Sequence, residues 1–204
     1  MVSQARSWAG VELSERQRIR RSDLLRAGIE LLGAPDGPAV NVRAVCRASG
    51  LTERYFYESF TDRDQFVAEV YADVAEQARN TLIGAVAATD SPLARARAAV
   101  EAFVQLIIDR PAMGRVLLIA PMTEPGLGGR GMASAPGFAL LIEEQLGMIE
   151  DPQERQLLSV GLVGALASLF IGYLDGTITV ERERFIAHCV DLLSRAYSWH
   201  RGQK

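Results

Sequence analysis

Apolar residues recur at intervals of three and four along most of the chain, which is the spacing of one face of an α-helix. In the first such stretch these positions are Leu24, Leu25, Ala27, Gly28, Leu31 and Leu32. Ser14 and Gln17 have the form of a capping box, so a helix is predicted from about Glu15 to Leu32. The turn-forming run GAPDGP, residues 33–38, ends this helix.

Two short amphipathic helices are predicted next. Asn41 can cap the first, which spans residues 42–49, and Gly50 supplies the left-handed residue that ends it. The second follows a Thr52 cap after a turn of about three residues that contains this glycine. Two short helices joined by such a turn have the layout of a helix-turn-helix.

The helical spacing continues to the end of the chain, and no alternating strand pattern is present. Asp62 can cap a long fourth helix, and a Gly-rich tract at 125–137 is predicted to be a long mobile loop. Further helices are expected at about 92–109, 112–120, 137–149, 153–175 and 181–199. The fold class is therefore all-α, with a disordered arm at 1–13, a three-helix helix-turn-helix domain at 14–62 and a larger helical domain at 63–204.

Charge is unevenly distributed along the chain. Residues 1–64 hold ten arginines against nine acidic residues, whereas residues 65–204 hold twelve basic residues against sixteen acidic ones. Four of the arginines fall within six positions: Arg16, Arg18, Arg20 and Arg21. Such a basic patch favours a local site for a polyanion, with a solvated helix face as the alternative.

Composition indicates a soluble globular protein, because 49% of the residues are apolar and 23% are charged. Cys46 and Cys189 lie far apart without the spacing of a metal site, so we expect reduced thiols, no metal and no cofactor. Residues 1–20 lack a secretory signal, which predicts a cytoplasmic location. The uncharged segment 157–174 just reaches membrane-spanning length, but its small residues favour a buried helix at a subunit interface, and no membrane partner is expected.

Aromatic residues are concentrated in the second helix of the pair. At 100° per residue Phe56 and Phe60 point the same way, toward the core, whereas Arg54, Tyr55 and Tyr57 are presented to solvent. A short helix with such a face suits the DNA major groove, where Arg can bond guanine and tyrosine hydroxyls can bond phosphate. A contact with another protein is the alternative.

The order of these features along residues 16–70 is specific. The matching positions are Leu24, Ala27-Gly28, Leu31-Leu32, Gly37, Asn41, Val45-Cys46, Ser49-Gly50-Leu51, Tyr57, Phe60, Arg63 and Phe66. In this spacing the chain resembles the N-terminal domain of the tetracycline-repressor (TetR) family of bacterial transcriptional regulators. Asn41 stands where that family usually has Thr, and Ser59 stands where it has His or Tyr, which puts one DNA-backbone contact in doubt.

The resemblance implies a double-stranded DNA operator as partner. Tyr57 and Arg63 are then expected to bind phosphates, while Thr52 and the residues after it approach the groove. The expected DNA-binding residues are Asn41, Arg43, Thr52, Arg54, Tyr55, Tyr57 and Arg63.

The resemblance also implies that the C-terminal domain forms a homodimer through its last two helices and holds a small-molecule effector. The expected dimer residues are Gly161, Gly164, Ser168, Phe185, Cys189 and Leu192. The candidate pocket residues are Phe103, Ile107, Met113, Leu117, Met122 and Phe138, although apolar residues at helical spacing more often form core than a ligand wall. An apolar wall of this kind suits a small, largely apolar ligand.

Enzymatic alternatives are weak. The run GLGGRG at 126–131 satisfies GxGxxG, but Pro121 and Pro125 interrupt any strand leading into it. His188 and His200 are the only histidines, and no hydrolase motif accompanies them. We therefore expect no enzyme but a homodimeric transcriptional regulator, a repressor released from a near-palindromic operator by its ligand. The alternative is a helical ligand-binding or carrier protein that does not bind DNA.

Overall fold

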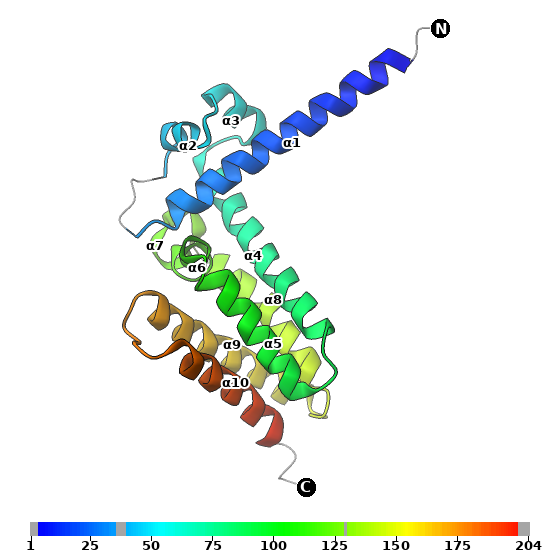
Figure 1. Cartoon of the computed structure of the whole chain (residues 1–204), viewed down its shortest axis with the longest axis vertical. Coiled ribbons are helices and arrows are strands. Elements are labelled where there is room, and N and C mark those ends of the chain that lie inside the picture. The colour runs from blue at the N-terminus through cyan, green and yellow to red at the C-terminus, as the bar shows by residue number, and fades with distance from the viewer. Residues whose placement is uncertain (1–3, 36–39, 129, 200–204) are drawn as a thin grey trace.

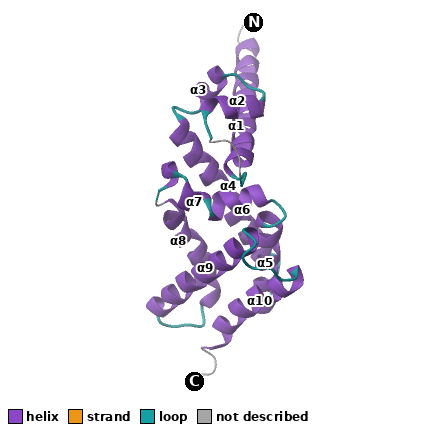
Figure 2. Cartoon of the chain, turned by 90° about the vertical axis from the view of Figure 1, so that its left-hand side faces the viewer, coloured by secondary structure: helices purple, strands orange, loops and turns teal. Residues whose placement is uncertain are grey.

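The computed structural model describes residues 4–35, 40–128 and 130–199, and all regular structure within these ranges is helical, as predicted (Figure 1). The α-helices are α1 (Gln4–Leu32), α2 (Val42–Ser49), α3 (Glu53–Ser59), α4 (Arg63–Ala87), α5 (Pro92–Ile107), α6 (Pro111–Leu118), α7 (Ala120–Thr123), α8 (Arg130–Glu143), α9 (Pro152–Leu174) and α10 (Arg182–Trp199). Two 3-10 turns, η1 (Pro125–Leu127) and η2 (Glu144–Leu146), flank α8. Helices α1–α3 occupy one end of the molecule, and α4 runs from them along the remaining helices (Figures 1 and 2).

The boundaries of α2 and α3 follow from local chemistry. Asn41 Oδ1 accepts a hydrogen bond of 2.9 Å from the Ala44 amide, which caps α2 as expected. Gly50 has φ 71°, so the left-handed exit predicted for it is confirmed. Thr52 takes the position before α3, but its side chain makes no capping bond. The capping role predicted for the Thr52 side chain is therefore wrong, and the residue is exposed.

Three phenylalanines pack together where α3 meets α4. Phe56 of α3 and Phe60, the residue that follows the helix, are buried, as predicted. Phe66 of α4 closes the cluster, with its ring centroid 5.2 Å from that of Phe56 and 5.0 Å from that of Phe60. Aromatic pairs at these distances are favourable contacts. The cluster therefore fixes α3 against the first turns of α4.

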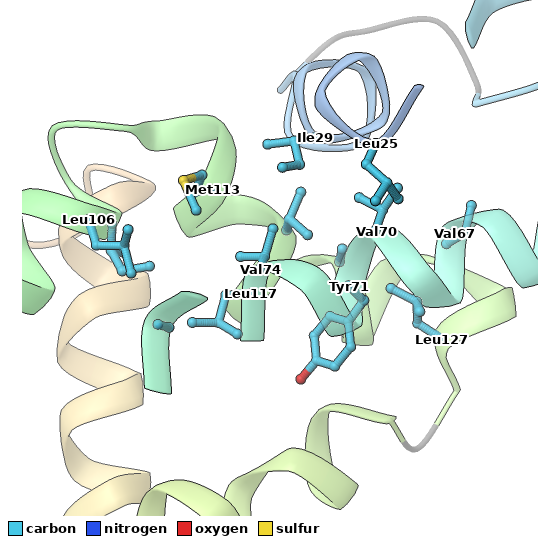
Figure 3. Packing of buried hydrophobic residues seen from close by; sticks show 14 of the residues in the cluster. Leu25, Ile29, Val67, Val70, Tyr71, Val74, Leu106, Met113, Leu117 and Leu127 are labelled. Atoms are coloured by element: carbon cyan, nitrogen blue, oxygen red, sulfur yellow. The ribbon is translucent and has the colours of Figure 1, made fainter. Parts of the chain in front are cut away.

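The crossing of α1 and α4 explains the glycine within α1. A Cβ atom placed on Gly28 would lie 2.6 Å from Cζ of Phe66 and 2.6 Å from Cγ2 of Val70. Only glycine permits the two helices to approach this closely. Figure 3 shows Leu25 and Ile29 of α1 above α4 at this crossing.

Two segments differ from the sequence expectation. Helix α1 begins at Gln4 rather than near Glu15, so residues 4–13, expected to be a disordered arm, are helical and Ser14 lies inside the helix. Most of the added residues are good helix formers, and none is proline. The loop expected at 125–137 contains η1 and the start of α8, in which Pro136 is an internal residue. Residues such as Met, Ala and Leu around this proline favour helix.

The larger bundle is built around α5. Helix α5 packs against α4 on one side and α10 on another, while α8 packs along α9. Its core includes Val104, Phe170 and Phe185, with the Phe170 and Phe185 ring centroids 5.1 Å apart. The buried residues at both ends of the molecule form one hydrophobic cluster, to which α4 contributes Phe66 and, farther along the helix, Val74. The two domains are thus joined by one continuous helix.

Candidate functional site

Helix α3 presents a polar face opposite its buried phenylalanines. The Arg54 side chain is 83% exposed, and Tyr57 is 56% exposed. Arg54 Nε lies 3.0 Å from Glu58 Oε1 at i, i+4 spacing. Arg54 and Tyr57 are therefore exposed to solvent, as their spacing predicts.

Tyr55 is less available than the sequence suggests. It is half-buried, because the Arg20 guanidinium carbon lies 4.3 Å from the centroid of its ring. Arg20 also lies 3.9 Å from a carboxylate oxygen of Glu58. A cation over an aromatic face is a stabilising contact. The expectation that Tyr55 is freely presented is therefore corrected, since its ring helps to attach α3 to α1.

The arginine cluster of α1 is divided between two uses. Arg20 and Arg21 pack inward: Arg21 lies over the Phe60 ring, 5.1 Å from its centroid, and pairs with Glu69. Arg18 is exposed and pairs with Glu15 at 2.7 Å within the same helix. At least part of the expected basic patch is therefore structural.

The remaining expected DNA-binding residues surround α3. Arg43 on α2 is highly exposed and lies 3.6 Å from Glu53, while Thr52 is exposed at the turn. Asn41 uses its side-chain oxygen for the α2 cap. Together with Arg54 and Tyr57, Arg43 and Thr52 form the exposed polar surface of the helix-turn-helix, which we call the α3 surface.

Arg63 is held by protein acceptors. Its Nε donates to the Val40 carbonyl at 2.8 Å, its Nη1 to Asp64 at 2.9 Å and its Nη2 to Glu124 at 2.8 Å. Burial disfavours its charge, but the hydrogen bonds to Glu124 and Asp64 outweigh this and raise the pKa of Arg63 above its ordinary value. The expected phosphate anchor is thus engaged between the two domains in this structure.

A cavity of about 770 Å³ lies in the larger domain. Its walls come from α4, α5, α6, α8, α9 and α10, together with the α4–α5 connection and η2. Of the six candidate pocket residues, Phe103, Leu117 and Phe138 line it. Its volume is in the range of small-molecule sites.

Three other candidate pocket residues lie elsewhere. Ile107 and Met113 are buried in the hydrophobic core where α5 meets α6, outside the cavity lining. Met122 is 66% exposed on α7. These three expectations are corrected, because helical spacing identifies a buried face without distinguishing solid core from a cavity wall.

Several lining residues were not expected from the sequence. They are the C-terminal half of α4, including Leu82 and Val86, and three polar side chains, Tyr71, Arg95 and Gln145. The apolar spacing of Leu82 and Val86 was a readable signal for a buried face. No short motif marks Arg95 or Gln145, since they come from different helical segments 50 residues apart.

Helix α9 has an exposed apolar face. Leu157 is 71% exposed and Val160 is 56% exposed, and Gly161, Gly164 and Ser168 are exposed on the same helix. Helix α9 is long and apolar enough to cross a membrane, yet only 22% of its most apolar 18-residue window is buried in the protomer. The three small residues therefore remain candidates for an interface.

The α10 residues expected at that interface are mostly turned inward. Phe185 stacks near Tyr173, with ring centroids 4.3 Å apart, and belongs to the protomer core. Cys189 is also buried there, and this burial raises the pKa of its thiol to about 11. Phe185 and Cys189 are corrected to core residues, because this stripe of α10 packs on α5. Leu192 is half-buried.

The GxGxxG run does not have the setting of a nucleotide-binding loop. Gly126 lies in η1, and α8 begins at Arg130. The elements before the run are α6 and α7, which are helices where that fingerprint requires a strand.

No family model and no curated protein sequence matches this chain. Solved structures, in contrast, are similar to this chain. A TetR-like transcriptional regulator from Rhodococcus sp. RHA1 is 19% identical, with 90% of this chain and 96% of that chain covered and a TM-score of 0.67. A putative transcriptional regulator from Pseudomonas aeruginosa PAO1 is 19% identical, with coverages of 89% and 91% and a TM-score of 0.71. The fatty acid degradation regulator FadR from Bacillus halodurans is 11% identical, with coverages of 85% and 94% and a TM-score of 0.71.

The TM-scores and coverages establish a shared fold, and at identities of 11–19% they establish the fold alone. The chain has the all-helical fold seen in TetR-like transcriptional regulators, as the sequence resemblance implied. The likeness extends over both domains, because about nine-tenths of the chain is covered.

Proposed function

We propose that this protein is a homodimeric DNA-binding transcriptional regulator, a repressor that leaves a near-palindromic operator when a small, largely apolar ligand binds. The observation that carries the proposal is the two-sided character of α3. Phe56 and Phe60 anchor it, while Arg54 and Tyr57 extend outward. A DNA major groove admits one α-helix with such a face. The fold shared with transcriptional regulators supports the same role and, with it, a cytoplasmic location.

In this proposal the residues of the α3 surface have different tasks. Arg54 bonds a base edge, preferably O6 and N7 of guanine, whereas Tyr57 donates its hydroxyl to a phosphate. Arg54 must first leave Glu58, 3.0 Å away. An exposed pair of this spacing contributes about 0.3–0.5 kcal/mol, so the cost is small beside a bidentate contact to guanine. Arg43 and Thr52 flank the helix.

A second copy of the chain covers the apolar face of α9. Leu157 and Val160 give this face its apolar area, while a Cβ atom added to Gly161 or Gly164 would have no neighbouring atom within 4 Å among the described residues. Small residues therefore leave room for another helix to approach. A closed two-fold dimer presents two α3 helices to half-sites about 34 Å apart, one turn of DNA, which requires a near-palindromic site.

Ligand release follows from the shared use of α4. The cavity is lined by α4, and the same helix carries the α3 surface through the phenylalanine cluster. A ligand that binds better to one position of α4 shifts the dimer toward one spacing of its α3 helices. The operator then binds the unliganded dimer, in which the two α3 helices have the spacing that fits the DNA.

Selection of bound sequences from random duplex DNA by the purified protein tests this proposal. We expect enrichment of a symmetric motif with two half-sites. A carrier protein without DNA binding, the alternative function, would enrich nothing even at low ionic strength. It would also keep its ligand affinity after simultaneous replacement of Arg54 and Tyr57 by alanine.

A further inference from the structure

The cavity has a closed, mostly apolar end and an exposed end. Tyr71, Leu117 and Phe170, all buried, lie toward the DNA-binding domain. Ile83 and Leu93 also line the cavity but are exposed, and they belong to the far end of α4 and the start of α5. From Tyr71 to Ile83 the helical rise of 1.5 Å per residue gives a length of roughly 18 Å. The cavity is therefore elongated, with one end at the surface.

A single guanidinium lies at the exposed end. Arg95 is half-buried on the first turn of α5, where its Nε donates to the Thr89 carbonyl at 3.0 Å and its Nη1 to Gln145 Oε1 at 3.2 Å. These two bonds fix the plane of the group. Within the described residues its Nη2 has no protein acceptor. An arginine fork held in place with a spare donor suits a carboxylate or a similar anion.

Other polar groups of the lining are already engaged or carry less charge. Ser91 Oγ accepts from the Ala94 amide, and Ser194 Oγ donates to the Val190 carbonyl. Glu144 is the second charged residue of the lining, but it is exposed and makes no ion pair with Arg95 in the described structure. Water and salt screen an exposed carboxylate. Arg95 is thus the strongest polar determinant of this cavity.

We infer that the cavity binds an elongated amphipathic acid, with its carboxylate on Arg95 and an unbranched apolar tail along the wall that Phe103, Phe138 and Phe170 form. This inference rests on the effector cavity of the proposed function and gives its ligand a chemical class. Burial of each further methylene strengthens binding by about fourfold until the closed end is reached. The contact between the carboxylate and Arg95 sets the orientation of the bound ligand, because an apolar tail alone could bind in either orientation.

Dodecanoate and 1-dodecanol are suitable probes, since they share a tail and differ in the head group. Calorimetric titration of the full chain, below the critical micelle concentration of dodecanoate and below the solubility limit of 1-dodecanol, gives both affinities. We expect dodecanoate to bind about tenfold more tightly, the usual effect of a hydrogen bond to a charged group. This comparison needs no variant, so it holds whatever substitutions do to folding.

Variants then locate the head group. Arg95→Gln is expected to remove the preference for dodecanoate, whereas Arg97→Gln, on the same helix and paired with Glu101 at 3.2 Å, keeps it. Equal binding of the two probes, no binding of either, or equal loss in the two variants would overturn the inference. DNA binding is measured separately on the same samples. A protein that selects a symmetric DNA site but ignores dodecanoate disproves only the ligand class, and one that binds dodecanoate through Arg95 but no DNA disproves only the proposed regulator.

Discussion

Nη2 of Arg63, at the start of α4, lies 2.8 Å from each carboxylate oxygen of Glu124, which follows α7. The Arg63 Nε also binds the Val40 carbonyl, just before α2. One side chain therefore joins the helix-turn-helix unit to the larger domain. The Glu124 side chain is only 13% exposed, so water competes weakly for this contact. We call these three residues the interdomain clamp.

Breaking the clamp should cost stability. Glu124→Ala removes a charge-assisted bond and leaves Arg63 Nη2 without that acceptor, so we expect a loss of about 1–3 kcal/mol in the free energy of unfolding. Urea unfolding followed by circular dichroism measures it. Asp64→Ala is the control, because Asp64 also pairs with Arg63 but is exposed, and its loss should stay below about 1 kcal/mol. Equal losses of stability in the two variants would show that the Arg63–Glu124 bond stabilises the protein no more than the exposed Arg63–Asp64 pair does.

Arg54→Ala should change which sequences bind. The loss of a bidentate contact to guanine weakens the selected site by about tenfold and relaxes preference at one position in each half-site. Repeating the selection with the variant gives both results. Arg79→Ala, a substitution of an exposed arginine farther along α4, should leave the motif unchanged. If Arg54→Ala selected the same DNA motif as the wild-type protein, Arg54 would have no role in base recognition.

Tyr57→Phe should lower the affinity for all DNA sequences to a similar extent. The ring stays in place beside Phe56, with centroids 5.4 Å apart, and only the hydroxyl is lost. One hydrogen bond to phosphate corresponds to roughly a three- to tenfold loss of affinity. Fluorescence anisotropy with the selected site and with a scrambled duplex checks this. A loss confined to the selected site would instead assign Tyr57 to base contact.

Gly28→Ala should destabilise the protein although alanine favours helix. The added methyl group would meet Phe66 and Val70 at 2.6 Å, and overpacking of this kind costs about 1–3 kcal/mol. Gly84→Ala is the matched control, since Gly84 lies in α4 with nothing within 4 Å of the added atom, and it should gain about 0.5–1 kcal/mol. Thermal melts of the two variants are expected to shift in opposite directions. A stabilised Gly28→Ala would contradict the close crossing of α1 and α4.

A charge on the α9 face should separate the subunits. Leu157→Glu places a carboxylate where the proposed partner helix packs, so sedimentation velocity is expected to change from dimer to monomer at micromolar concentration. Met122→Glu, on an equally exposed apolar residue of α7, should leave the dimer intact. A monomeric wild-type protein, or dissociation by both variants, would exclude this face as the dimer contact.

The sequence was sufficient where structure depends on near neighbours. The Asn41 cap, the Gly50 exit and the inward direction of Phe56 follow from spacing within a few residues, and the structure contains all three. The Arg63–Glu124 bond joins positions 61 residues apart, which no local pattern connects. Cys189 illustrates a second limit, since an apolar position on an amphipathic helix can serve a protomer core or a partner with the same spacing.

Within one turn, α4 contacts α1 on one side and lines the cavity on the other. Val70 meets α1 at Gly28, whereas the neighbouring Tyr71 lines the cavity and points away from α1 (Figure 3). Because Gly28 has no side chain, α1 and α4 are in direct contact at this turn, and we expect a displacement of the turn by a bound molecule to move α1 as well. Under the proposed function, Val70 and Tyr71 would connect the cavity directly to the helices that carry the α3 surface.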